Sequence, residues 1–117
     1  MYKRQAQGDG EICGTAVEVP AIITLRFDLL KRHIIEWPRI ESVQEIMTVC
    51  SARPLEDAAR LAFKEMIEWL RRDFGVGTYE AYMLLSVAGS ARLAQIVDPL
   101  YTVVAKLRKS ILEQLRR

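Results

Sequence analysis

The residues best suited to chemistry lie near the start of the chain, in the Gln-Gly-Asp-Gly-Glu run at residues 7–11. If this 7–11 segment is extended, its period of two places Gln7, Asp9 and Glu11 on one face and the glycines on the other. A small ligand or a metal ion could then approach closely, because glycine removes the steric barrier. Asp-Gly is also the commonest hairpin-turn dipeptide, since it tolerates positive φ. Spacing alone favours the turn over the ligand-facing strand.

Length and composition limit what kind of protein this is. The chain has 117 residues, of which 50% are apolar and 27% charged, a balance typical of one soluble globular domain. A net charge of +2 without a basic stripe argues against a nucleic-acid partner. No apolar run approaches a membrane span, and no secretory signal pattern is present. Cys13 and Cys50 lack metal-ligand spacing, which favours free thiols in the cytosol over a disulfide or a zinc site.

The first half of the chain predicts strands. Residues 11–19 are rich in small and β-branched side chains, and residues 23–29 alternate between apolar and polar as a half-buried strand does. Residues 34–37 and 46–50 predict two further short strands. These strands must hold the 7–11 segment in place.

The second half begins with helical periodicity. Apolar residues recur at helical spacing from Pro54 to residue 74, acidic residues open this stretch, and Gly75 is a natural stop. Thr78 can cap a second, shorter helix that ends at Gly89. Strands at 93–97 and 101–107 and a helical tail at 110–117 complete the prediction. The fold class is therefore α+β, with first-half strands packed against a long amphipathic helix and a second helix, followed by C-terminal strands.

Other reactive or bulky side chains are expected to be structural. Cys13 is expected to be a small buried strand residue, because free cysteine is commonly buried. We expect His33 in a solvated loop, Arg53 solvated or paired at a helix entry, and Glu18 as an edge-strand charge. Three large side chains of the helices are expected in the core: Met66, Trp69 and Met83.

Four blocks of the sequence resemble the acetamidase/formamidase family, in the family's order. They are Gly-Asp-Gly-Glu-Ile-Cys-Gly-Thr-Ala-Val-Glu at 8–18, Ile-Glu-Trp-Pro-Arg-Ile at 35–40, Ser-Ala-Arg-Pro-Leu-Glu-Asp-Ala-Ala at 51–59 and Ala-Gln-Ile-Val-Asp-Pro at 94–99. The resemblance is to the C-terminal part of such an enzyme. It implies an incomplete part of a β-sandwich-based amidase that acts on short linear amides, releasing a carboxylic acid and ammonia.

The resemblance also implies roles for the 7–11 segment. Amide hydrolysis needs a polarised carbonyl, an activated water and a proton for the departing ammonia. We expect Glu11 as the general acid and base, Asp9 as a metal ligand or water orienter, and Gln7 as a substrate-binding residue. A divalent metal, zinc or calcium, would then be held by Asp9 and Glu11.

The start of the chain separates two hypotheses. Residues 1–5 match nothing that follows and look like a translated sequencing-adaptor remnant from environmental DNA, which leaves residues 6–117 as the C-terminal part of a single amidase-type domain. The family's motif is usually preceded by a His-Ala pair, and Arg4 stands where that histidine would fall. The first hypothesis is an amidase fragment, inactive alone, from a cytoplasmic homo-oligomer that acts on small amides. The alternative is a non-enzymatic small-molecule binding or interaction module of the same architecture.

Overall fold

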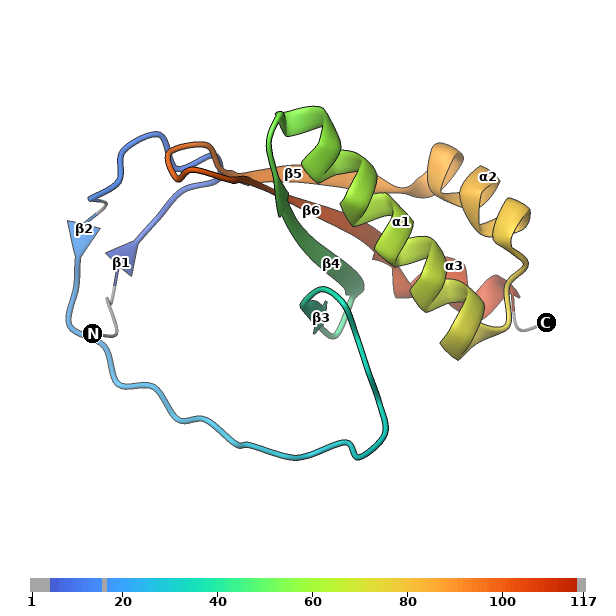
Figure 1. The fold of residues 1–117 in the computed structure, drawn as a ribbon. Coiled ribbons are helices and arrows are strands. Elements are labelled where there is room, and N and C mark those ends of the chain that lie inside the picture. The colour runs from blue at the N-terminus through green and yellow to red at the C-terminus, as the bar shows by residue number, and fades with distance from the viewer. Residues whose placement is uncertain (1–4, 16, 116–117) are drawn as a thin grey trace.

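The fold combines antiparallel sheets with three helices, as the sequence predicts. The computed structural model describes residues 5–15 and 17–115. A two-stranded sheet pairs β1 (Gln5–Ala6) with β2 (Val17–Glu18), and a four-stranded antiparallel sheet has the order β3-β4-β6-β5 (Figure 1). The bounds of the larger sheet's strands are Arg39–Glu41 for β3, Glu45–Ala52 for β4, Ser90–Gln95 for β5 and Tyr101–Arg108 for β6. The helices are α1 (Leu55–Phe74), α2 (Thr78–Ala88) and α3 (Lys109–Leu115).

The long helix α1 begins and ends where its sequence dictates. Pro54 is the N-cap, one residue outside the helix, and Glu56 follows in the first turn, where a negative charge suits the helix dipole. Arg71 and Arg72 occupy the last turn. Gly75 ends the helix with φ of 70°, a left-handed conformation that glycine adopts without a Cβ clash. The predicted helix at 54–74 is confirmed to within one residue.

Helix α1 covers one face of the larger sheet, along β4 and β6 (Figure 1). Alternate residues of these two strands are buried beneath it: Ile46, Thr48, Cys50, Val103, Ala105 and Leu107. The Thr48 hydroxyl donates a 2.7 Å hydrogen bond to the Ala62 carbonyl of α1, so its buried polar atom is satisfied. The strands predicted at 46–50 and from residue 101 are therefore confirmed as β4 and β6. Packing under α1 fixes the position of β6.

The shorter helix α2 packs on α1 through few residues. Its N-cap is Gly77, whose N–H donates to the Glu80 carboxylate at 3.1 Å, whereas Thr78 is already helical. Ala81 and Leu85 are buried, but Met83 lies about 200° around the helix from each of them and is 59% exposed. The expectation of a core position is therefore wrong for Met83. It is confirmed for Met66 and Trp69.

The N-terminal strands form only in small part. Of the described residues in 11–19, only 17–18 belong to a strand, and residues 19–38 form neither helix nor strand. The predicted strands at 23–29 and 34–37 are therefore wrong: Phe27, for example, is 86% exposed. In Figure 1 this stretch, light blue to cyan, swings clear of the sheets. An alternating pattern becomes a strand only where a neighbouring strand pairs with its backbone, and no described strand pairs with residues 23–29.

The strand and helix predicted at the C-terminal end agree with the structure. The strand predicted at 93–97 overlaps β5, and the helix predicted at 110–117 begins one residue earlier as α3. Most of the leader expected at 1–5, including Arg4, lies outside the described residues, as do the last two residues of the tail.

The buried layer under α1 predicts a large effect at Met66. Met66→Ala should lower the free energy of unfolding by about 2–5 kcal/mol, because it removes fully buried volume and leaves a cavity. Met83→Ala is the matched control, since the same change at an exposed site should shift stability by about 0.5 kcal/mol or less. Urea denaturation followed by circular dichroism measures both. Equal losses would contradict the core assigned here.

The exposed run at 22–35 predicts binding of a hydrophobic dye. The 117-residue chain should enhance and blue-shift the fluorescence of an anilinonaphthalene sulfonate, because contiguous apolar surface attracts such dyes. Phe27→Ser combined with Leu29→Ser should reduce that signal. Val43→Ser is the control, since Val43 is equally exposed but lies outside the run. A dye-silent parent chain would contradict the exposure of this stretch.

Candidate active site

The 7–11 segment docks against the end of β5. Gly10 donates a backbone hydrogen bond to the Ala94 carbonyl at 3.2 Å, and Ile96 donates one to the Glu11 carbonyl at 3.3 Å. Glu11 and Gln95 thus form a parallel β-bridge. The segment extends the larger sheet by one short parallel step, so residues more than 80 positions apart share one corner of the molecule.

A turn, and not an extended strand, shapes the segment. Asp9 and Gly10 lie in a turn, and Gly10 has φ of 84°. A Cβ at Gly10 would meet only the Leu93 side chain at 3.9 Å, so the backbone conformation and not lack of space calls for glycine. The turn interpretation of Asp-Gly is confirmed. The regular alternation that placed Gln7, Asp9 and Glu11 on one face is interrupted at this turn.

Asp9 is held by an arginine that the sequence analysis did not single out. The Arg92 guanidinium donates from Nε to one Asp9 carboxylate oxygen at 2.8 Å and from an NH2 group to the other. The hydrogen bond to Asp9, and then the negative charge of Asp9, raise the pKa of Arg92 above its ordinary value. Both side chains are about half exposed, at 49% for Arg92 and 56% for Asp9.

Glu11 differs from Asp9 in having an uncommitted carboxylate. The residue is half-buried, and only its main chain is tied to β5. Among the described residues, its carboxylate has no hydrogen-bond or ion-pair partner. The exposed side chain of Gln7 is equally uncommitted within that part of the chain. Of the three predicted site residues, Glu11 and Gln7 therefore keep their polar groups available, while both oxygens of Asp9 are engaged.

The Gln95 side chain holds the loop next to Glu11 through hydrogen bonds. Its amide nitrogen donates to the Leu100 carbonyl at 2.6 Å and to the Thr102 hydroxyl at 2.9 Å. Its amide oxygen accepts from the N–H groups of Val97 and Asp98, each at 3.0 Å. With four hydrogen bonds, this amide is fully satisfied and fixes the loop at 96–100 that connects β5 to β6.

A row of polar residues crosses the sheet to this corner. Ser51 of β4 lies opposite Thr102 of β6, Thr102 lies opposite Gln95 of β5, and Gln95 bridges to Glu11. The Ser51 and Thr102 hydroxyls are hydrogen-bonded at 2.8 Å. Three of the four family-like blocks, at 8–18, 51–59 and 94–99, therefore meet at one end of the sheet. Gln95 lay inside one of those blocks, a signal that could have marked it, whereas nothing in the sequence pointed to Arg92.

The described residues do not by themselves form a metal site. Within residues 5–15 and 17–115, no group of three or more His, Cys, Asp or Glu side chains is placed to hold a metal ion. Asp9 and Glu11 alone would supply two residues, fewer than zinc or calcium sites commonly use, and Asp9 already binds Arg92. Zinc or calcium at these residues stays a prediction, and no catalytic step is derived through a metal.

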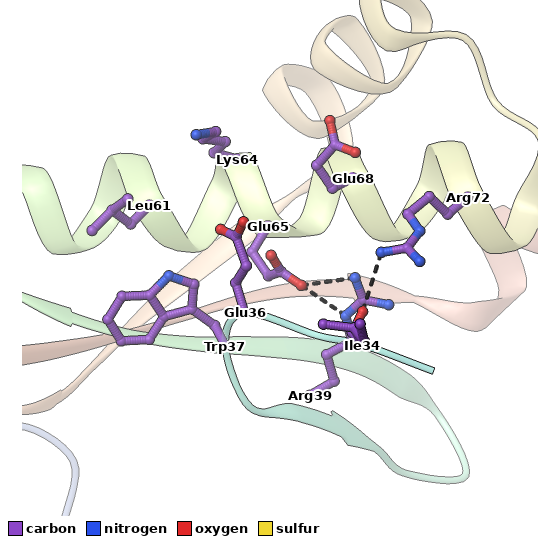
Figure 2. A pocket seen from close by; sticks show the side chains of 9 residues that line it. All are labelled: Ile34, Glu36, Trp37, Arg39, Leu61, Lys64, Glu65, Glu68 and Arg72. Atoms are coloured by element: carbon purple, nitrogen blue, oxygen red, sulfur yellow. Dashed lines mark hydrogen bonds and ion pairs between the residues drawn. The ribbon is translucent and has the colours of Figure 1, made fainter. Parts of the chain in front are cut away.

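The remaining block, at 35–40, lines a separate hollow of about 350 Å³ against α1. Figure 2 shows Arg39 reaching toward Glu65, with Nε and NH2 donating to one carboxylate oxygen at 2.8 and 2.7 Å. Both side chains are more than 90% buried, at 8% and 7% exposure. Arg39 also lies 5.0 Å from the centre of the Trp69 ring. The hollow is therefore built around an ion pair that ties the block to the helix.

The two cysteines lie in different environments. The two cysteines are not joined in a disulfide, and the Cys13 thiol is hydrogen-bonded with the Thr15 hydroxyl at 3.1 Å. Cys13 is exposed in the loop between the Glu11 bridge and β2, so the expectation of a buried strand residue is wrong. Cys50 is buried under α1, and burial, followed by the charge of Glu65, raises its pKa to about 12.

Three other expectations concern exposed residues. His33 is exposed outside any helix or strand, as expected. Arg53 is exposed just before α1, and its guanidinium lies 5.3 Å from the centre of the Tyr101 ring. Glu18 is exposed on β2, which agrees with an edge-strand charge.

None of the described helices combines the length and the apolar composition that crossing a bilayer requires.

Solved bacterial acetamidases contain this arrangement of strands and helices. An acetamidase from Yersinia enterocolitica is 55% identical and superposes with a TM-score of 0.86 over 91% of this chain and 32% of its own. An acetamidase from Bacillus halodurans is 36% identical, with a TM-score of 0.83 over 94% of this chain and 37% of its own. A predicted acetamidase/formamidase from Thermoanaerobacter tengcongensis is 29% identical, with a TM-score of 0.66 over 73% and 28%.

The sequence comparison gives the same family. The profile of the Acetamidase/Formamidase family matches residues 4–114. No curated protein sequence matches the chain. The chain belongs to the acetamidase/formamidase family, and it spans about a third of the length of the solved relatives.

The Gln95 network predicts that one amide side chain orders the loop beside Glu11. Gln95→Met keeps the side-chain length but removes the acceptor of the Val97 and Asp98 N–H groups, so their protection against hydrogen exchange should fall by about 1–3 kcal/mol. Amide exchange read by NMR measures this loss. Gln44→Met, in an exposed turn, should leave both amides unchanged. Unchanged protection in the Gln95 variant would contradict the proposed role of this side chain.

Proposed function

We propose that the family-length protein containing these residues hydrolyses short linear amides of the formamide and acetamide type, with Glu11 as its general acid and base. One observation carries the proposal: within the described residues Glu11 has the uncommitted carboxylate of the 7–11 segment, and its main chain is fixed to the end of β5. Membership of the acetamidase/formamidase family, and solved relatives named acetamidases, support the substrate class.

The chemistry fits a carboxylate in this position. An amide resists water because its carbonyl is weakly electrophilic and its nitrogen leaves poorly. Glu11 would take a proton from the attacking water, and it would then return that proton to the departing nitrogen. Water and the amide thereby give one carboxylic acid and one ammonia. The Gln7 amide, which both donates and accepts hydrogen bonds, would orient the substrate.

The 117 residues alone should be inactive under this proposal. They span about a third of the solved relatives, so most of a family-length protein lies outside them. A homo-oligomer of the family-length protein stays a prediction. The alternative function, a non-enzymatic module that binds small molecules, would use the same corner without turnover. It would be favoured if Arg4, which stands where the family usually has histidine, belonged to the natural chain and not to an artefactual leader.

A family-length chimera tests the proposal. The part of the Yersinia acetamidase that precedes its matching segment is joined to residues 6–117, and ammonia release from formamide, acetamide and propionamide is measured with and without chelator. Glu11→Gln should lower kcat by about 100-fold or more, because it removes the proton-transferring group. Glu56→Gln, an exposed change in the first turn of α1, is the control and should leave kcat unchanged.

The outcomes separate the two functions. Turnover retained in Glu11→Gln would remove Glu11 from the mechanism. A folded parent chimera that binds acetamide but releases no ammonia would favour the binding module.

A further inference from the structure

The two acids of the 7–11 segment are placed for different tasks. Both carboxylate oxygens of Asp9 accept hydrogen bonds from Arg92, whereas the Glu11 carboxylate has no partner among the described residues. A guanidinium that binds both oxygens of one carboxylate fixes its orientation as well as its position. Sequence spacing alone treats the two acids as equivalent.

Three consecutive residues of the segment are each fixed to β5 or the residue after it. The side chain of Asp9 binds Arg92, the N–H of Gly10 binds the Ala94 carbonyl, and the carbonyl of Glu11 binds the Ile96 N–H. The two main-chain bonds at 3.2 and 3.3 Å are long, and they lie on only one side of the turn apex. The Asp9–Arg92 pair ties the preceding residue to β5 through its side chain, a third attachment that would restrict rotation of the segment about the bridge.

We propose that Arg92 is a positioning residue that clamps Asp9 and thereby aims the Glu11 carboxylate at the substrate. Asp9 then acts through Arg92 and contacts neither substrate nor metal. This inference rests on the proposed function only in naming Glu11 as the reacting group. The clamp itself stands on the geometry of Asp9, Arg92 and the β-bridge.

The pair is suited to positioning more than to folding stability. Exposed ion pairs contribute little to stability, because water screens their charges and ordering two side chains costs entropy. Loss of the clamp should therefore lower kcat while the melting temperature and KM change little. A residue that served only folding would show the opposite pattern.

A double-mutant cycle in the family-length chimera tests the clamp. Arg92→Gln and Asp9→Asn should each lower kcat by about 10- to 100-fold, the loss expected from a small misplacement of a catalytic group. The double variant should fall no further than either single variant, since both remove one shared interaction. If Asp9→Asn is far more damaging than Arg92→Gln and the two losses add, Asp9 acts directly on substrate or metal and the proposal is overturned.

Two further variants sharpen the test. Arg92→Lys keeps the charge but cannot form the two-bonded fork, so its kcat should lie between those of the parent and Arg92→Gln. A lysine variant with the parent's kcat would show that charge alone suffices and would overturn the fork. Arg26→Gln is the matched control, because Arg26 forms a similar exposed pair with Asp28 at 2.9 Å, and it should leave kcat unchanged.

Amide exchange keeps the clamp testable if the parent chimera shows no turnover. In that case the proposed function fails, and protection of the Gly10 and Ile96 N–H groups decides the clamp separately. Arg92→Gln and Asp9→Asn should reduce this protection equally, and the double variant should reduce it no further. Unchanged protection in both single variants would overturn the clamp.

Discussion

The site depends on the parallel bridge between Glu11 and Gln95. Two main-chain hydrogen bonds join a segment at the start of the chain to the end of β5, and no side chain of the segment is used to make them. Glu11 therefore keeps its carboxylate available while its backbone is fixed. The bridge depends in turn on β5, which is paired along β6, and β6 is buried under α1. The apolar layer below α1 thus determines where Glu11 lies.

A second tie joins the chain before β4 to the same helix. Arg39 of β3 is buried against Glu65, and it lies over the ring of Trp69. Buried charges are tolerated only when they are paired, so the loss of either side chain would leave the other charge buried without a partner. Asp73, 3.5 Å from Arg39, adds a second negative charge at the edge of the pair. The family-like block at 35–40 therefore serves the attachment of β3 to α1, at a distance in the fold from the corner that holds Glu11.

Most of the chain between β2 and β3 lacks a neighbour that would give it regular structure. Residues 19–30 are exposed throughout, although apolar and polar side chains alternate over residues 23–29. The chain spans about a third of its solved relatives, and the apolar side chains of this run have nothing to pack on within the described residues. The well-packed part of the molecule is consequently α1, α2 and the larger sheet, with the candidate site at one end of that sheet.

The sequence by itself determined the features that depend on neighbouring residues. The ends of α1, the Gly75 stop, the extent of β4 and β6, and the Asp9-Gly10 turn all follow from local patterns, because capping, periodicity and glycine's tolerance of positive φ act over a few residues. The family resemblance assigned Glu11 the role of general acid and base, and that role stays a prediction. It assigned Asp9 the role of a metal ligand or water orienter, without its ion pair with Arg92.

Only the tertiary structure decided what depends on partners distant in sequence. Arg92 meets Asp9 across 83 residues, Gln95 is recognised by its four hydrogen bonds, and Met83 is exposed because of where α2 lies on α1. The strand predicted at 23–29 does not form for the same reason. Alternation of apolar and polar residues indicates that one face would favour burial, but a strand also needs a partner surface, which local sequence does not provide.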